Sequence, residues 1–149
     1  MKTETLFSSR SIEWETPQYL FDELDKEFHF TLDPCCTHEN AKCEKHYTKE
    51  DDGLSKDWTG ERVYCNPPYG KEVKPWVQKC LDHSLRGGLA VMLIPARTDT
   101  KVFHDYIYHK AEIRFIRGRL KYGRNGNFQE SSPFPSMIVI YRPQKSEKM

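Results

Sequence analysis

The segment Asn66-Pro67-Pro68-Tyr69 combines residue types that can hold a planar nitrogen compound. It follows the stretch Glu61–Cys65, which predicts a short buried strand, and its two prolines end that strand because proline cannot donate a hydrogen bond to a sheet. The Asn66 side-chain oxygen and a neighbouring main-chain carbonyl can accept the two hydrogens of an amino group. We expect the Tyr69 ring to be exposed, so that it can lie against the ring that carries this group. An ordinary strand-ending turn is the competing interpretation, since Asn and Pro are common turn residues.

A second cluster of reactive residue types could suggest zinc: Cys35, Cys36, His38, Cys43 and His46. A structural zinc site usually has paired ligands that are separated by two to four residues. Here two cysteines are adjacent, and adjacent cysteines rarely bind one tetrahedral ion. We therefore expect no metal, and reduced thiols at all five cysteines of the chain.

Charge is unevenly distributed along the chain. Residues 1–60 hold 7 Lys and Arg against 14 Asp and Glu, whereas residues 61–149 hold 16 against 8. The basic excess is concentrated between positions 97 and 124, which suits a polyanion such as DNA. The candidate DNA-binding residues are Arg97, Lys101, Arg117, Arg119, Lys121 and Arg124. An ordinary solvated surface can show the same asymmetry.

Length and composition favour one compact domain. A chain of 149 residues is too short for two substantial domains, so we expect a single domain with frayed ends and a core at about residues 14–142. No apolar run is long enough to cross a membrane, and residues 1–10 lack the apolar centre of a signal peptide. Together with the irregularly spaced cysteines, this predicts a cytoplasmic protein without a membrane partner.

The elements before Asn66 must bring it to the edge of a sheet. Thr16 and Pro17 suit the N-cap and first position of a helix, whose apolar residues recur at helical spacing as far as Phe28. The alternating stretch 28–32 predicts a strand that ends at Asp33, and an acid at the carboxyl end of a strand is where open α/β sheets place ligand contacts. Residues 40–47 predict a short helix.

The elements after the turn alternate helices and strands. Apolar spacing predicts a helix from Val73 to Leu85, and the continuous apolar run 89–94 is typical of a strand covered on both faces. Thr98 or Asp99 should cap a third helix, and strands should follow at 111–116 and 136–141. This order predicts a Rossmann-like α/β sheet with an abbreviated flank and an antiparallel last strand.

Seven short motifs follow one another along residues 14–142: W-E-T-P, T-L-D-P-C, D-G-L-S-K-D-W, Y-C-N-P-P-Y-G, I-P-A-R-T-D-T, G-R-L-K-Y-G and P-S-M-I-V-I. Together they resemble the small bacteriophage-type DNA N6-adenine methyltransferase (Dam) family. The resemblance implies the class I, S-adenosylmethionine-dependent methyltransferase fold. It also implies that Asn66, Pro67, Pro68 and Tyr69 form the catalytic turn, and that Thr16-Pro17, Asp33-Pro34 and Asn66 bind the cofactor. Many such enzymes have a glycine-rich turn after the first strand, where this sequence has residues 33–38 instead.

The implied reaction moves a methyl group from S-adenosylmethionine to the N6 amino group of adenine in DNA, in the host cytoplasm if a phage encodes the protein. Asn66 and a main-chain carbonyl at Pro67 would accept the amino hydrogens while Tyr69 stacks on the base. An acid among Asp51, Asp52 and Asp57 would hold the ribose hydroxyls of the cofactor, and Asp52 is slightly favoured because a glycine lets the loop turn beside it.

Alternatives to this function stay open. The same turn resembles that of enzymes that methylate RNA adenine or the side-chain amide of a protein glutamine, and a non-catalytic DNA-binding relative is a third hypothesis. Because the chain leaves little room for a separate recognition domain, the choice of DNA sequence would fall to short loops such as 117–132. A partner subunit, as in a homodimer, could supply it instead.

Overall fold

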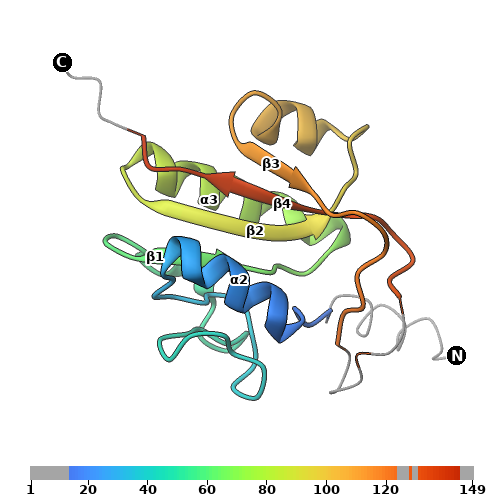
Figure 1. The fold of residues 1–149 in the computed structure, drawn as a ribbon. Helices are drawn as coiled ribbons and strands as arrows, with labels where there is room; N and C mark the ends of the chain where they lie inside the picture. The colour runs from blue at the N-terminus through green and yellow to red at the C-terminus, as the bar shows by residue number, and fades with distance from the viewer. Residues whose placement is uncertain (1–13, 124–127, 129–130, 145–149) are drawn as a thin grey trace, which may run out of the picture.

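A computed structural model describes residues 14–123, 128 and 131–144, and its centre is a four-stranded sheet (Figure 1). The strands are β1 (Arg62–Cys65), β2 (Leu89–Pro95), β3 (Glu112–Phe115) and β4 (Ser136–Tyr141), and they lie in the order β1-β2-β4-β3. β1 and β2 are parallel, whereas β4 is antiparallel to both of its neighbours. The mixed α/β class and the antiparallel last strand are thereby confirmed.

The two central strands are the most apolar elements of the chain. Every residue of β2 and of β4 is buried, as expected for strands with neighbours on both sides and a helix-covered face. Cys65 lies opposite Met92 in the parallel register, so β1 and β2 end at the same edge of the sheet. The turn that starts at Asn66 and the segment that starts at Ala96 therefore leave the sheet side by side.

Two helices cover the sheet from opposite sides (Figure 1). In α2 (Gln18–Phe28), the ring of Phe21 packs edge-on against Tyr64 of β1, with ring centroids 5.2 Å apart. In α3 (Val73–Leu85), Cys80 contacts the next residue of that strand, Cys65. The side chains of neighbouring residues in β1 thus point to opposite faces of the sheet, as in any β-strand. Both predicted helices are confirmed.

The start of α2 differs from the predicted cap. Pro17 is the N-cap residue, the helix begins at Gln18, and no side chain caps it. The Thr16 hydroxyl lies 2.5 Å from the hydroxyl of Tyr64 instead, and both side chains are buried. The prediction of Thr16 as N-cap is wrong because this hydroxyl satisfies a buried tyrosine, which would otherwise lack a partner.

The strand and the helix predicted before β1 are also wrong. Phe28 is the last residue of α2, and the C-cap residue His29 adopts a left-handed conformation (φ 55°). Within residues 28–33, only Leu32 and Asp33 form isolated bridges, to Val63 and His46 respectively. Residues 40–47 form turns and bends, since main-chain groups of this segment bond to the Asp33 region rather than to one another.

The segment between β2 and β3 contains a π-helical turn, η3 (Phe103–Ile107). The Thr100 hydroxyl accepts the Phe103 N–H at 3.2 Å, so Thr100 takes the role that the sequence predicted for Thr98 or Asp99. The following strand is confirmed, with the narrower bounds of β3. None of the helices in the described ranges is long and apolar enough to cross a bilayer.

Candidate functional site

The Asn66 carboxamide is held from two sides. Its nitrogen donates a hydrogen bond to the main-chain carbonyl of Trp14, and its oxygen accepts one from the Tyr69 hydroxyl at 2.5 Å. The same hydroxyl lies 3.1 Å from the Leu93 carbonyl oxygen and 3.4 Å from the Tyr122 hydroxyl. The turn after β1 is therefore tied to the segment before α2, to β2 and to the segment after β3.

The Tyr69 ring is buried, with 8% of its surface exposed, so the predicted exposed ring is wrong. Tyr122 and Phe134 cover it edge-on, with centroids 6.1 and 5.6 Å from its own. Both residues lie more than fifty positions further along the chain, which is why the local sequence gave no sign of them. Burial raises the pKa of the Tyr69 hydroxyl well above its usual value, so this group stays a neutral donor.

A cavity of about 350 Å³, here called the Asp33 cavity, opens on one side of Asn66. Most predicted cofactor-binding residues line it: Thr16, Asp33, Pro34, Asp52 and Asn66, with Pro68 of the turn. Pro17 and Pro67 are buried but do not line it. Asp51 and Asp57 do not line it either. The Asp57 carboxylate accepts hydrogen bonds from the Thr59 N–H and hydroxyl at 3.0 and 2.6 Å, and the Asp51 carboxylate accepts them from the Thr48 N–H and hydroxyl at 2.9 and 3.1 Å.

Asp33 shapes the wall of this cavity. One carboxylate oxygen accepts the Lys42 main-chain N–H at 2.9 Å, and the other accepts the Cys35 N–H at 3.3 Å. The side chain is 3% exposed, and this burial raises the pKa of Asp33 from 3.8 to about 6, while the two N–H groups act in the opposite direction. Asp33 thus fixes the loop that follows it, from Cys35 to Lys42.

A second cavity of about 500 Å³, the Tyr69 cavity, opens on the other side of the turn. Its wall is mostly apolar: Trp14, Tyr69, Val73, Phe103, Phe134 and Met137. Arg97 also lines it, with its guanidinium carbon 5.7 Å from the centroid of the Phe134 ring. A flat ring could be enclosed here, and an anionic group attached to the ring would meet Arg97 at the wall.

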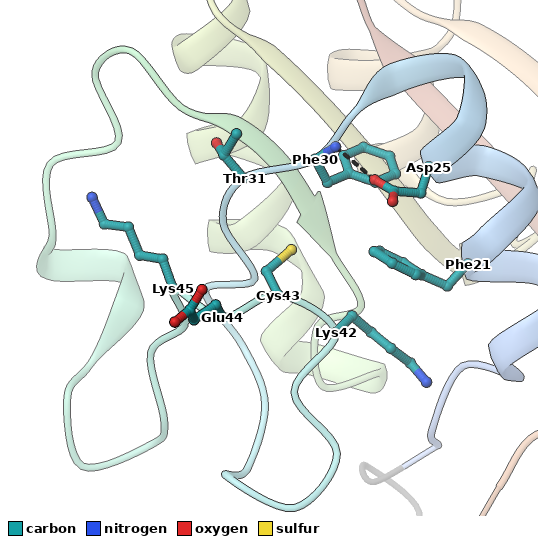
Figure 2. Close-up of a pocket in the computed structure, with 8 residues that line it drawn as sticks. All are labelled: Phe21, Asp25, Phe30, Thr31, Lys42, Cys43, Glu44 and Lys45. Atoms are coloured by element: carbon teal, nitrogen blue, oxygen red, sulfur yellow. Dashed lines mark hydrogen bonds between the residues drawn. The ribbon is translucent and has the colours of Figure 1, made fainter.

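A third hollow, of about 520 Å³, lies away from Asn66, between α2 and residues 42–45 (Figure 2). Figure 2 shows the rings of Phe21 and Phe30 on one side, and the Lys42 and Lys45 side chains pointing away from each other. The Asp25 carboxylate, which lines this hollow, accepts a hydrogen bond from the Phe30 N–H at 2.8 Å, so it already has a partner within the protein. No predicted site residue lines this hollow, and we assign it no chemistry.

The predicted DNA-binding residues lie in two places. Arg97 and Lys101 are exposed. Arg97 lines the Tyr69 cavity, and Lys101 lies beside it because its neighbours Thr100 and Val102 line the wall. Arg117, Arg119 and Lys121 are exposed on the segment that leads to Tyr122, and Arg124 lies outside the described residues. Among the ion pairs of the described residues, none involves these five side chains, whereas Arg114 and Arg142 pair with Glu27 and Glu112.

The cysteine and histidine cluster has no metal-binding geometry within residues 14–123, 128 and 131–144, where no three potential ligands come together. His38 and His46 face each other at 2.9 Å. Cys35 lines the Asp33 cavity, but burial raises the pKa of its thiol to about 12, so it is not a nucleophile near neutral pH.

Sequence reasoning missed three aromatic residues of the site. Trp14 lines both cavities, Trp76 lines the Asp33 cavity, and Tyr122 bonds to Ser136 at 2.8 Å beneath the Tyr69 ring. The alternation of apolar Leu120, basic Lys121 and aromatic Tyr122 in the sequence was a signal that this basic segment also has an inward face, and Leu120 and Tyr122 are indeed buried. Trp14 begins the W-E-T-P motif, but no local pattern pointed to its place in the site, because its partners Tyr122 and Phe134 are distant in sequence.

Similarity to known proteins covers almost the whole chain. The model of the DNA N-6-adenine-methyltransferase (Dam) family matches residues 2–149. The DNA N-6-adenine-methyltransferase of Haemophilus phage HP1 (strain HP1c1) is 30% identical over 149 residues, which cover 96% of this chain and 85% of the relative. The enzyme of the same name from Escherichia phage T1 is 30% identical over 116 residues, which cover 76% of this chain and 48% of the relative.

The raised pKa of Asp33 predicts how stability changes with pH. The folded protein holds this proton more tightly than the unfolded chain, so the contribution of Asp33 is most favourable below pH 4 and is lost between pH 4 and about 6. Relative to Asp33→Asn, which does not titrate, the free energy of unfolding of the parent should fall by about 3 kcal/mol across this window and stay level above it. Urea titrations at several pH values measure the difference. A pH-independent difference would contradict the buried, raised carboxyl.

Proposed function

The chain belongs to the DNA N-6-adenine-methyltransferase (Dam) family, and we propose that its methyl transfer takes place at Asn66, between the Asp33 cavity and the Tyr69 cavity. It is a DNA methyltransferase that acts on the N6 amino group of adenine. The position of the Asn66 side chain is the observation that supports this site. The side chain lines the Asp33 cavity, and its carboxamide oxygen accepts a hydrogen bond from the Tyr69 hydroxyl. We assign the cofactor to the Asp33 cavity and the target adenine to the Tyr69 cavity.

The Asp33 cavity suits S-adenosylmethionine, which supplies an electrophilic methyl group on a positively charged sulfur. Glu15, Asp52 and Glu72 place carboxylates in its wall, where they can bind an ammonium group or hydroxyl groups, and the Trp76 ring adds an apolar face. A volume of about 350 Å³ is in the range of small-molecule sites. The position of the cavity beside the carboxyl end of β1 supports a class I methyltransferase fold.

Asn66 acts on the target amino group. Its oxygen accepts one amino hydrogen, and a carbonyl at Pro67 accepts the other, which favours a pyramidal nitrogen whose lone pair can attack the methyl carbon. The carbon–nitrogen bond forms as the carbon–sulfur bond breaks, the electron pair of the broken bond returns to sulfur, and the proton of the methylated nitrogen leaves to water. Adenine nitrogen needs this help because its lone pair is delocalised into the ring.

The Tyr69 hydroxyl must release the Asn66 oxygen before the amino group can use it. A second acceptor is already within reach, since the Leu93 carbonyl oxygen lies 3.1 Å from the hydroxyl. The exchange leaves no buried donor without a partner, which would otherwise cost about 1–3 kcal/mol. In this proposal the Tyr69 ring stacks on the adenine after the base has left the duplex, a step that costs on the order of a few kcal/mol.

DNA is expected on the side where the unpaired cations lie. Lys121 is exposed next to Tyr122, which contacts the Tyr69 ring, so a phosphate bound there would be close to the target base. Arg97 and Lys101 beside the Tyr69 cavity would hold the flanking backbone. The described core residues form one cluster, which supports a single domain, and the phage origin of the similar enzymes supports a role in the host cytoplasm.

The proposed function is tested by offering labelled S-adenosylmethionine with DNA, RNA or a glutamine-containing protein in parallel. Label should enter DNA alone and should be recovered as N6-methyladenine after digestion to nucleosides. Label found in glutamine or in RNA adenine would show that the protein or the RNA, and not DNA, is the substrate. Absence of transfer to all three would support a non-catalytic DNA-binding relative.

Two of the three candidate acids in the loop before β1, Asp52 and Asp57, are expected to give opposite results for cofactor binding. Asp52 lines the Asp33 cavity, whereas the Asp57 carboxylate is bonded to Thr59. Asp52→Asn should weaken the binding of S-adenosylhomocysteine by roughly 10- to 100-fold, since a hydrogen bond to a charged group contributes about 1.5–3 kcal/mol. Asparagine also tolerates the left-handed backbone at this position (φ 62°), so the variant should fold.

Asp57→Asn is the matched control and should bind the cofactor product with the parental constant. Isothermal titration calorimetry measures both. Equal constants for the parent and Asp52→Asn would remove Asp52 from the site, and a loss confined to Asp57→Asn would place the ribose elsewhere.

Charge reversal tests the cationic segment. Arg119→Glu and Lys121→Glu should raise the Kd for DNA and flatten its salt dependence by roughly one unit of slope per lost phosphate contact, because fewer counterions are released. Arg86→Glu makes the same charge change beyond the carboxyl end of α3, at the opposite end of the sheet from Asn66. It should leave the slope unchanged. Parental slopes for all three variants would place the DNA on another surface.

A further inference from the structure

Trp14 occupies the boundary between the two cavities. Among the residues that the structure describes, it is the one that lines both the Asp33 cavity and the Tyr69 cavity. It is half-buried and comes from the segment before α2, outside the sheet that carries the catalytic turn. A molecule in either cavity would therefore meet the same residue.

The main chain of Trp14 determines which way the Asn66 carboxamide faces. A carbonyl oxygen can only accept, so the Asn66 group beside it must be the NH₂ group. The amide oxygen is then on the opposite side, where the Tyr69 hydroxyl donates to it. If the carboxamide were flipped, two oxygens would face each other, and the acceptor for an amino group would be lost.

The side chain of Trp14 is fixed by aromatic and main-chain contacts. Its ring lies edge-on to Tyr122 at 5.7 Å and to Phe134 at 5.5 Å, the same two residues that cover Tyr69. The next residue, Glu15, exchanges two main-chain hydrogen bonds with Gly123, at 2.7 and 2.8 Å. Trp14, Tyr122 and Phe134 thus form one aromatic wall, and main-chain pairing holds Trp14 in it.

We propose that Trp14 contacts the extruded adenine and couples its capture to the binding of the methyl donor. This inference rests on the proposed function, in which the cofactor occupies the Asp33 cavity and the base the Tyr69 cavity. A cofactor in the Asp33 cavity packs against one side of Trp14 and an extruded base in the Tyr69 cavity packs against the other, so each ligand completes a surface that the other contacts. The coupling is reciprocal, since each ligand must raise the affinity for the other by the same factor.

The test measures the coupling with DNA that carries 2-aminopurine at the target position, whose fluorescence rises when the base leaves the stack. Titrations are made with and without saturating S-adenosylhomocysteine. In the parent enzyme the cofactor product should tighten capture of the base on the order of tenfold, a typical coupling between sites. Trp14→Ala should weaken capture and bring this ratio close to one, while Trp14→Phe should keep part of both.

Trp76→Phe is the matched control, because Trp76 lines the Asp33 cavity alone. It should weaken the binding of S-adenosylhomocysteine and leave the coupling ratio at saturation unchanged. Urea unfolding of each variant shows whether it is folded, and Trp14→Phe carries the test if Trp14→Ala is not.

The inference is overturned if Trp14→Ala keeps the parental coupling ratio, or if Trp14→Phe keeps it where Trp14→Ala does not fold. A coupling ratio of one in the parent enzyme would overturn it as well. If the parent captures no 2-aminopurine at all, the proposed function fails instead. If capture and coupling persist without Trp14, only the role of Trp14 fails.

Discussion

The orientation of one side-chain amide is the constraint on which the rest of the site depends. Asn66 can serve an amino group only if its oxygen faces the substrate, and this is decided by what its nitrogen meets on the other side. The Trp14 carbonyl fills that position, and the Tyr69 hydroxyl holds the oxygen in place. Because Tyr69 has a second acceptor in Leu93, the oxygen can be released without leaving a buried polar group unpaired.

The fold brings these groups together from distant parts of the chain. Parallel pairing of β1 and β2 places Asn66 and Arg97 at one edge of the sheet, and the short pairing of Glu15 with Gly123 brings the segment before α2 to the same edge. The buried carboxylate of Asp33 secures the loop that walls the Asp33 cavity. The two cavities therefore share a boundary that contains the Asn66 turn and Trp14, which is the geometry that a transfer between two bound molecules requires.

Much of this arrangement was predictable from local sequence, and the failures have a common cause. The apolar run of β2, the helical spacing of α3 and the prolines after Asn66 gave elements that the structure confirms. The Thr16 cap and the exposure of Tyr69 were wrong because each side chain has a partner far along the chain, Tyr64 in one case and Tyr122 and Phe134 in the other. The stretch 28–32 alternates like a strand, but Phe28 is buried as the last residue of α2 instead. Local pattern was sufficient for the long apolar elements, whereas tertiary contacts decide the structure of the short segments and which side chains remain available.

The most direct test of this account is the rate of a single turnover of Asn66→Ala on DNA with saturating S-adenosylmethionine. Asn66→Ala should lower this rate by roughly 10²–10³-fold, as for the loss of a hydrogen bond that strengthens in the transition state, while the folded variant still binds the cofactor. Tyr69→Phe, which keeps the ring and frees the Asn66 oxygen, should methylate at close to the parental rate. Methylation of DNA adenine by Asn66→Ala at the parental rate would contradict the account.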